Sequence, residues 1–127
     1  MSSQHIWTLV ANERPVQQNA YRRMHHFERA TYDKRWRQWG LVLARQAKVP
    51  HLERITIAID TIHGRRPCPD IMANSATVKA FIDGLVDASV IENDRNTIAS
   101  ITFREPTYEK GKDALIIEIH SQEGEGT

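Results

Sequence analysis

The sequence has few of the features that identify several large protein classes. It holds one cysteine, Cys68, which excludes an internal disulfide, and its Cys and His residues lack zinc-finger spacing. No apolar run approaches the roughly 20 residues that a membrane-spanning helix needs. The first residues, MSSQHIW, lack the pattern of a signal peptide. We therefore expect a cytoplasmic protein with no membrane partner.

Motifs of several common enzyme classes are also absent. The chain has no Gly-rich phosphate loop, no nucleophile elbow and no triad order of Ser, His and Asp, so nucleotide hydrolysis by a P-loop is not expected. His25 and His26 are neighbours in a segment that favours helix. Their side chains should therefore point to different faces, which argues against a shared metal. A lone histidine, His63, stands beside a loop where it could touch a substrate.

What the chain does contain is an uneven distribution of charge. Its 127 residues carry a formal net charge of only +1. Residues 1–69 hold 12 Lys and Arg against 5 Asp and Glu, whereas residues 70–127 hold 5 against 11. Such an asymmetry suggests a part that binds a polyanion beside an acidic part. The alternative is that the two halves attract each other or are both solvated.

The apolar pattern predicts one domain over residues 1–121 and a flexible tail over residues 122–127. The fold class is α/β (α+β): a small mixed sheet of about four strands, two helices on one face, and the order β-α-β-α-β-β. The last two strands should form a hairpin around Gly111, and Gly40 could bend or weaken the first helix. The expected strands lie near residues 6–10, 55–60, 97–104 and 114–120, and the expected helices near 20–48 and 74–88.

An acid, a lysine and an Asn-Asp pair surround the second expected helix. Asp70 ends a Pro-rich loop before this helix, and Lys79 lies within it. Asn93 and Asp94 follow it. Carboxylates bind divalent cations, and an ammonium stabilises the charge that develops on phosphate. The set is therefore of the kind that breaks phosphodiester bonds.

These residues also have purely structural alternatives. Asp70 could favour the helix N-terminus, and the Asn-Asp pair could form a turn. Lys79 could pair with Asp83, one helical turn away. The expected helix is roughly 22 Å long at 1.5 Å per residue. The chain must therefore turn back along the helix before Asp70 and Asp94 can share an ion.

Cationic residues crowd the first expected helix and the loop before Asp70. Nucleic-acid phosphates attract such groups, and Tyr32 or Trp36 could stack on a base, unless both aromatic residues belong to the core. Arg65 and Arg66 could grip phosphate beside the metal or be solvated loop residues. The candidate DNA-binding residues are Arg22, Arg23, Arg29, Lys34, Arg35, Arg65 and Arg66.

Two spaced motifs occur in the second half of the chain. D-x(8)-K-A-x-x-D-G-L-V-D-A covers residues 70–88, and V-I-x-N-D covers residues 90–94. The strands ITFREP and ALIIEI follow, and an upstream stretch reads MHHFERATYDKRWRQW. On these motifs the chain resembles the RusA-type Holliday junction resolvases, above all the divergent versions that bacteriophages of actinobacteria carry. The likeness is clearest over residues 65–120.

The resemblance implies a homodimeric α/β endonuclease that uses Mg²⁺, or Mn²⁺ in its place, to make paired cuts in four-way DNA. It places Asp70, Lys79 and Asp94 at catalytic positions, and Asp70, Asp94 and Asn93 at the metal. The chain departs from the family pattern at two points. The second acid of the first pair is absent, with Met72 or Ala73 near its place, and Asn93 stands where the family has an aspartate.

These observations lead to rival functional hypotheses. The first is a phage-encoded, Mg²⁺-dependent endonuclease that resolves Holliday junctions or other branched DNA during recombination or replication. The second is a catalytically impaired protein of the same type that binds branched DNA or a host protein. A third is a non-enzymatic dimerisation module whose basic helix contacts an acidic partner.

Overall fold

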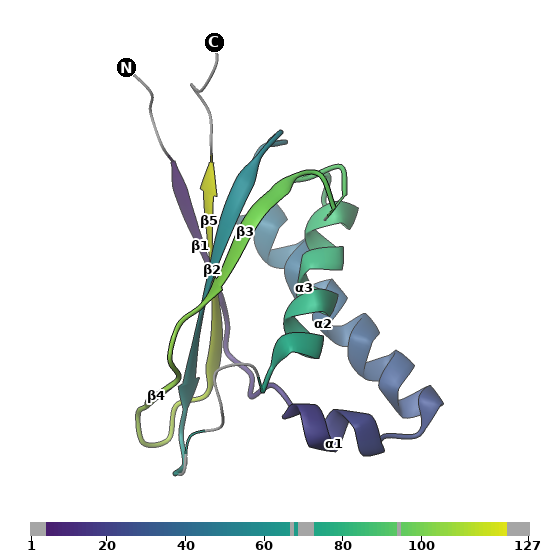
Figure 1. The fold of residues 1–127 in the computed structure, drawn as a ribbon, viewed down its shortest axis with the longest axis vertical. Coiled ribbons are helices and arrows are strands. Elements are labelled where there is room, and N and C mark those ends of the chain that lie inside the picture. Colours follow the sequence, from purple (N-terminus) through teal and green to yellow (C-terminus); the bar gives the residue numbers. More distant parts are fainter. Residues whose placement is uncertain (1–4, 67, 69–72, 94, 122–127) are drawn as a thin grey trace.

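The structure is a computed structural model that describes residues 5–66, 68, 73–93 and 95–121. The elements are β1 (Ile6–Ala11), α1 (Gln18–Arg23), α2 (His26–Gln46), β2 (Ile55–His63), α3 (Ser75–Asp87), β3 (Ile98–Phe103), β4 (Thr107–Tyr108) and β5 (Ala114–Ser121). Helices α2 and α3 cover one face of a five-stranded sheet, α1 lies below them on the same side, and the other face is open (Figure 1). The predicted α+β class and the one-sided placement of the helices are therefore confirmed. The predicted tail lies outside the described residues.

The sheet is mixed, and its last strand lies inside it. The strand order is β1-β5-β2-β3, with β4 also paired to β2. Strand β5 runs antiparallel to both β1 and β2, whereas β3 and β4 run parallel to β2. Alternate residues of the two inner strands point towards the helices, so Ile57, Ile59, Ile117 and Ile119 are buried. The period-2 pattern of these strands is that of a sheet with one covered face.

The predicted hairpin between the last two long strands is wrong. β3 and β5 lie on opposite sides of β2, and the connection between them crosses the end of β2. Two hydrogen bonds hold this crossing: Glu109 N donates to His63 O at 3.0 Å, and Gly111 N donates to Gly64 O at 3.4 Å. Gly111 does make a turn, with a φ of +75°. The short strand β4, which the sequence did not predict, precedes that turn.

The single helix expected over residues 20–48 is two helices, α1 and α2. Met24 and His25 between them have extended backbones, with ψ of 141° and 149°. His25 is therefore outside the helix, and its Nδ1 accepts a hydrogen bond from Phe27 N, which caps the start of α2. The ring centroids of His25 and His26 lie 4.2 Å apart. The expectation that these two side chains point to different faces is thus wrong.

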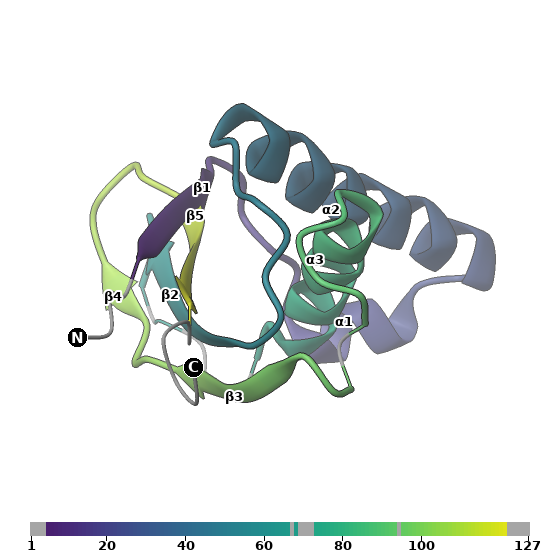
Figure 2. The same ribbon diagram turned by 90° about the horizontal axis from the view of Figure 1, so that it is seen from above.

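Helices α2 and α3 cross at two glycines (Figure 2). The Cβ position of Gly40 lies 3.2 Å from the Cα of Gly84. Gly40 does not interrupt α2, which continues to Gln46; it lets the two backbones approach closely. Trp36 and Phe81, from the same two helices, are fully buried beneath the crossing.

The chain reverses direction after α3. Ser89 has a φ of +62°, and Val90 N donates to Leu85 O at 3.0 Å. Val90 O in turn accepts a hydrogen bond from Leu52 N, which fixes the segment against the start of β2. Strand β3 then runs back alongside β2, in the direction opposite to α3 (Figure 1). The shared-ion hypothesis required a reversal before Asp94, which lies outside the described residues, whereas this reversal is made by β3, which begins at Ile98.

Candidate functional site

The predicted site is only partly described. Asp70 and Asp94, the two carboxylates expected to hold a metal, lie outside the described residues. Of the predicted catalytic residues the structure places Lys79, and of the predicted metal ligands it places Asn93. The site is therefore built from these two residues and from the cationic side chains around them.

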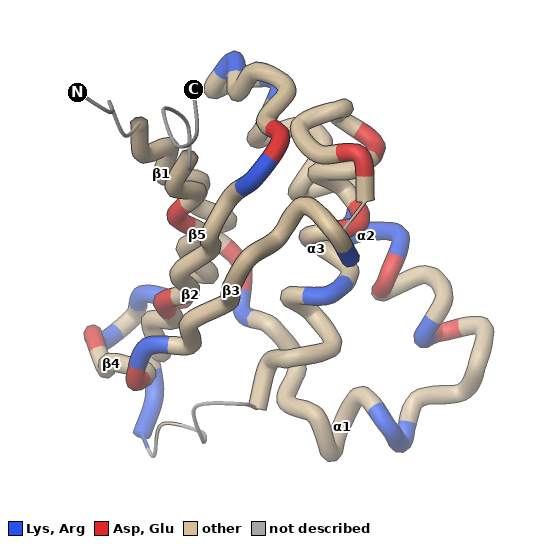
Figure 3. The backbone as a smooth tube through the Cα atoms, turned by 45° about the horizontal axis from the view of Figure 1, so that its top comes forward, with Lys and Arg blue, Asp and Glu red and all other residues tan. Residues whose placement is uncertain are grey.

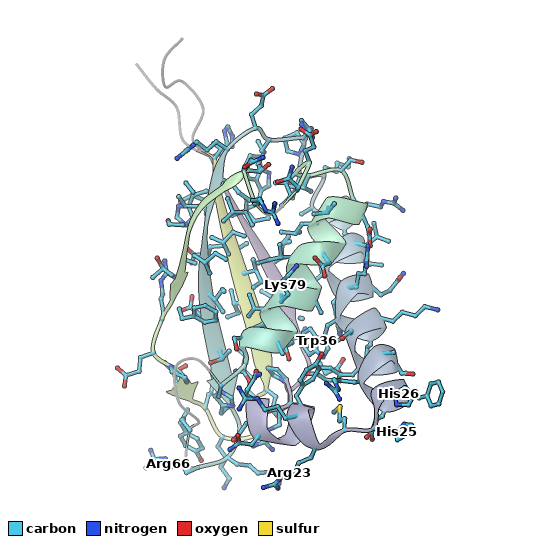
Figure 4. All side chains as sticks on the ribbon, turned by 45° about the vertical axis from the view of Figure 1, so that its right-hand side comes forward. Arg23, His25, His26, Trp36, Arg66 and Lys79 are labelled. Atoms are coloured by element: carbon cyan, nitrogen blue, oxygen red, sulfur yellow. The ribbon has the colours of Figure 1, made fainter. Side chains whose placement is uncertain are left out.

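Lys79 lies in the second turn of α3 with an exposed side chain (Figure 4). Its Nζ lies 2.9 Å from Asp83 Oδ1, which is the helical pair that the sequence offered as an alternative. An exposed pair of this kind contributes at most about 1 kcal/mol. A phosphate that approaches Lys79 therefore meets little resistance from Asp83.

Lys79 borders a groove of about 480 Å³ between α1, α2 and α3, which we call the helix groove. It brings together Lys79, predicted to be catalytic, and Lys34, predicted to bind DNA. No ion pair among the described residues involves Lys34, so its ammonium is available to an anion. The polar lining residues are Tyr21, Asp33, Lys34, Arg37, Lys79 and Asp83.

Hydrogen bonds already engage part of this lining. The Tyr21 hydroxyl lies 2.9 Å from both carboxylate oxygens of Asp33 and donates to that group. Burial and this hydrogen bond raise the pKa of Tyr21. Arg37 Nη2 donates to Asp87 Oδ1 at 2.8 Å, and this contact lowers the pKa of Asp87. The lining holds three cations and two carboxylates, and Arg37 is paired with Asp87 just outside it, so these charges balance.

Asn93 takes the turn-forming role that the sequence also allowed. Its Oδ1 accepts hydrogen bonds from Arg95 N at 3.0 Å and from Asn96 N at 2.8 Å. An amide oxygen has two acceptor lone pairs, so these bonds occupy the atom that would contact a cation. The observed geometry is that of a side chain that shapes the turn before β3.

Four of the predicted DNA-binding residues are exposed at one end of the molecule. Arg22 and Arg23 end α1, and Arg65 and Arg66 follow β2. Figure 4 shows Arg23 and Arg66 at this same end, and Figure 3 shows the basic segment of α1 there. The guanidinium of Arg66 lies 4.5 Å from the ring centroid of Tyr108, a cation–π contact.

Two other predicted DNA-binding residues are engaged within the protein. Arg35 Nε donates to both carboxylate oxygens of Glu13, at 2.9 and 2.7 Å. Arg29 is half-buried; its Nη2 donates to Met24 O at 3.5 Å, and its guanidinium lies 5.7 Å from the Tyr21 ring. These contacts hold α2 against the loop that follows β1 and against α1. Both residues are thus less available to phosphate than the sequence suggested.

The two aromatic residues considered for base stacking belong to the interior. Trp36 is 0% exposed. The Tyr32 hydroxyl accepts a hydrogen bond from Val16 N at 2.8 Å and bonds to the buried Thr77 hydroxyl. The core alternative is therefore confirmed for both. His63 is also buried, with 2% of its surface exposed, so it cannot touch a substrate at the surface.

Sequence reasoning missed three residues of the helix groove, Tyr21, Asp33 and Arg37. Ala30, Asp33 and Arg37 have the i, i+3, i+7 spacing of one helical face, and this spacing could have marked them as neighbours of Lys34. Tyr21 could not have been found in this way, because it reaches the groove only through the break between α1 and α2.

Among residues 5–66, 68, 73–93 and 95–121, no group of three or more His, Cys, Asp or Glu is placed to hold a metal ion. None of the helices in this part of the chain is long and apolar enough to cross a bilayer. No protein-family model matches the chain, and no curated protein matches it.

Proposed function

We propose that this protein is a RusA-like endonuclease that acts on branched DNA. The observation that carries the proposal is the helix groove, where the motif lysine Lys79 and the basic-helix residue Lys34 line one cavity. Two ammonium groups in one groove suit a backbone phosphate, because phosphate contacts supply most of the affinity of proteins for DNA.

In this proposal each group of side chains has a separate role. Lys79 stabilises the negative charge that develops on the phosphate under attack. Lys34 holds a neighbouring phosphate, and the exposed arginines at the end of α1 and after β2 bind the backbone further away. Asp70 and Asp94 would hold Mg²⁺ or Mn²⁺, which would supply Lewis-acid chemistry when bound. A homodimer would present the same site twice and so give symmetric cuts.

One observation favours a second candidate, a protein that binds branched DNA or a host protein without cutting. Asn93 stands where the resemblance expects an aspartate, and its Oδ1 already accepts two backbone hydrogen bonds. Mg²⁺ depends on a few well-placed carboxylates. Calorimetric titration with Mg²⁺ separates the two candidates, since only the nuclease should release or absorb heat at millimolar metal.

The test is cleavage of a labelled synthetic four-way junction by the purified protein with Mg²⁺ or Mn²⁺. The wild type should cut, and Asp94→Asn should not. Lys79→Ala should slow cutting roughly 100-fold, because one lost electrostatic contact to a transition state costs 10²–10³ in rate. Lys110→Ala, an exposed lysine beside the turn at Gly111, is the matched control and should cut at the wild-type rate.

Absence of cutting by the wild type with either metal would refute the nuclease. Equal rates for Asp94→Asn and the wild type would also refute it. In both cases, junction binding that weakens steeply with salt would support the second candidate.

A further inference from the structure

Three aromatic side chains form an exposed cluster where α1 gives way to α2. We call this cluster, His25, His26 and Phe27, the aromatic tip. The ring centroids of His25 and His26 lie 4.2 Å apart, as do those of His26 and Phe27, and His25 and Phe27 are 5.3 Å apart. Figure 4 shows His25 and His26 projecting from the end of α2, away from the sheet.

Phe27 has no role in the core. It is 71% exposed, the largest value among the exposed large apolar residues described. The buried side of α2 is provided instead by Trp36, Gly40 and Ala44. An aromatic ring left in water at a projecting corner gives up the free energy that burial would supply. A single exposed apolar residue is ordinary; what distinguishes Phe27 is that the rings of His25 and His26 pack beside it.

The corner around the tip is cationic. Arg22 and Arg23 occupy the last turn of α1, and both are exposed. The N-terminus of the 21-residue helix α2 adds the positive end of its dipole. Glu28 is the acid in the first turn of α2, so it only partly offsets these charges. The surroundings of the aromatic tip therefore attract an anionic partner.

The corner is also held in place. Nδ1 of His25 accepts a hydrogen bond from Phe27 N, and Arg29 Nη2 donates to Met24 O. The Arg29 guanidinium also lies over the Tyr21 ring of α1. The half-buried Arg29 thus ties the break between the helices to both of them. A tip braced in this way presents its rings at low entropic cost.

We propose that the aromatic tip stacks on unpaired nucleic-acid bases while Arg22 and Arg23 hold the flanking phosphates. Aromatic side chains stack on single-stranded bases of any sequence, and neighbouring cations follow the backbone. The inference takes from the proposed function only the class of substrate, branched DNA, which offers unstacked bases at the branch. It assigns to this corner the stacking role that the buried Trp36 cannot perform.

A membrane surface is the competing partner for an aromatic and cationic corner. Interfacial helices bind lipid through a long apolar face whose area sets the affinity. Here Glu28 and Thr31, next to Phe27 in the sequence and on the helix, are both exposed. The apolar area is one phenyl ring and two imidazoles. Bases that stack one or two at a time match this area better than a bilayer.

The experiment measures the affinity of the full chain for a labelled dT oligonucleotide, a four-way junction and a paired duplex, by fluorescence anisotropy in EDTA. Phe27→Ala should weaken binding to the oligonucleotide and the junction by roughly 5- to 150-fold, which corresponds to the loss of one stacked base. It should change duplex binding less than twofold. Phe27→Trp, which keeps an aromatic surface, should bind within twofold of the wild type.

Salt dependence separates stacking from phosphate contact. Phe27→Ala should leave the slope of log K against log salt unchanged, whereas Arg23→Ala should reduce it by about 0.7 on the single strand. Ile6→Ala removes an apolar side chain that is 53% exposed on β1 and serves as the matched control, with no expected effect. Unchanged circular dichroism of each variant excludes a general loss of fold.

The inference is overturned if Phe27→Ala binds the oligonucleotide and junction as the wild type does, or if the wild type binds neither. Loss of binding to phosphatidylserine vesicles by Phe27→Ala, with DNA binding intact, would assign the tip to membranes instead. Because the assay contains no divalent metal, its outcome is independent of cleavage. A protein that stacks bases but does not cut would retain this inference and lose the proposed nuclease activity.

Discussion

His63 lies at the end of β2 with 2% of its surface exposed, and among the described residues neither of its ring nitrogens has a hydrogen-bond partner. Burial lowers the pKa of His63 below its ordinary value of 6.5, and the charge of Arg14 lowers it further, while Asp113 acts in the opposite direction. Below pH 6.5 the unfolded chain therefore binds a proton at this residue that the folded chain does not. Acidification through this range must then favour unfolding.

We expect His63→Leu to make the free energy of unfolding less sensitive to acid. In the wild type this residue lowers that free energy by at most about 1.4 kcal/mol per pH unit below 6.5. Urea denaturation at pH 7.5, 6.5 and 5.5 measures the difference between the two proteins. His5→Leu, at an exposed histidine, controls for loss of an imidazole. If the free energy of unfolding depended on pH equally in the wild type and in His63→Leu, the effect assigned to His63 would be wrong.

The Tyr32 hydroxyl joins three segments, because it accepts from Val16 N and bonds to Thr77 on α3 while its ring belongs to α2. Tyr32→Phe leaves both partners without this contact, and Thr77 is 0% exposed. Loss of buried hydrogen bonds of this kind costs about 1–3 kcal/mol. Chemical denaturation should show that decrease. Tyr21→Phe, whose hydroxyl bonds to Asp33 at the border of the helix groove, should cost less.

At the scale of elements, the crossing of α2 and α3 leaves no room for a side chain at either of its two glycines. A Cβ on Gly40 would collide with the carbonyl oxygen of Phe81, and one on Gly84 would collide with that of Arg37. Backbone atoms cannot move aside as flexible side chains do. The helices would therefore have to separate, which would loosen the packing around Trp36.

We expect Gly40→Ala and Gly84→Ala each to destabilise the protein by about 1–3 kcal/mol or more, the usual cost of overpacking. Without steric contact, replacing Gly by Ala within a helix gains up to about 1 kcal/mol. The sign of the change therefore tests the contact directly. Thermal denaturation of both variants measures it, and a rise in midpoint for either would show that the backbones are further apart than described.

The sequence predicted most elements but not all of their connections. Alternation in Ile55, Ile57 and Ile59 gives β2 correctly, because one face of that strand is buried. The hairpin prediction failed because periodicity reports which face of a strand is buried and not which strand lies beside it. The break at Met24–His25 was missed because both residues tolerate a helix; the cap that His25 provides is visible only in three dimensions.

For the candidate site, the sequence predicted individual residues but not which of them lie together. The sequence identified Lys34 and Lys79 separately, from a basic helix and from a motif. Only the packing of α2 on α3 shows that both line one groove. The same holds for the aromatic residues. The sequence suggested Trp36 for base stacking, but Trp36 is buried, whereas Phe27, which no pattern marked, is exposed. Such assignments depend on tertiary contacts, which local sequence does not encode.

For the whole molecule, the order of the strands makes folding depend on β5, the last strand described. β5 lies between β1 and β2, and in the described sheet β1 is paired to β5 alone. Leu115, Ile117 and Ile119 of β5 are each 0% exposed. Burial of one such side chain contributes about 1.5–3 kcal/mol, so three of them together approach the 5–15 kcal/mol that stabilises a typical domain.

A chain that ends at Asp113 should therefore fail to fold, whereas one that ends at Ser121 should keep the wild-type stability. The first lacks the strand that joins β1 to β2, and the second retains every residue paired in the sheet. Circular dichroism on heating should show no cooperative transition for the shorter chain and an unchanged midpoint for the longer one. A cooperative transition in the shorter chain would mean that β1 and β2 can form the core without β5, against the strand order described. A lower midpoint in the longer chain would mean that residues 122–127 add to the domain rather than follow it.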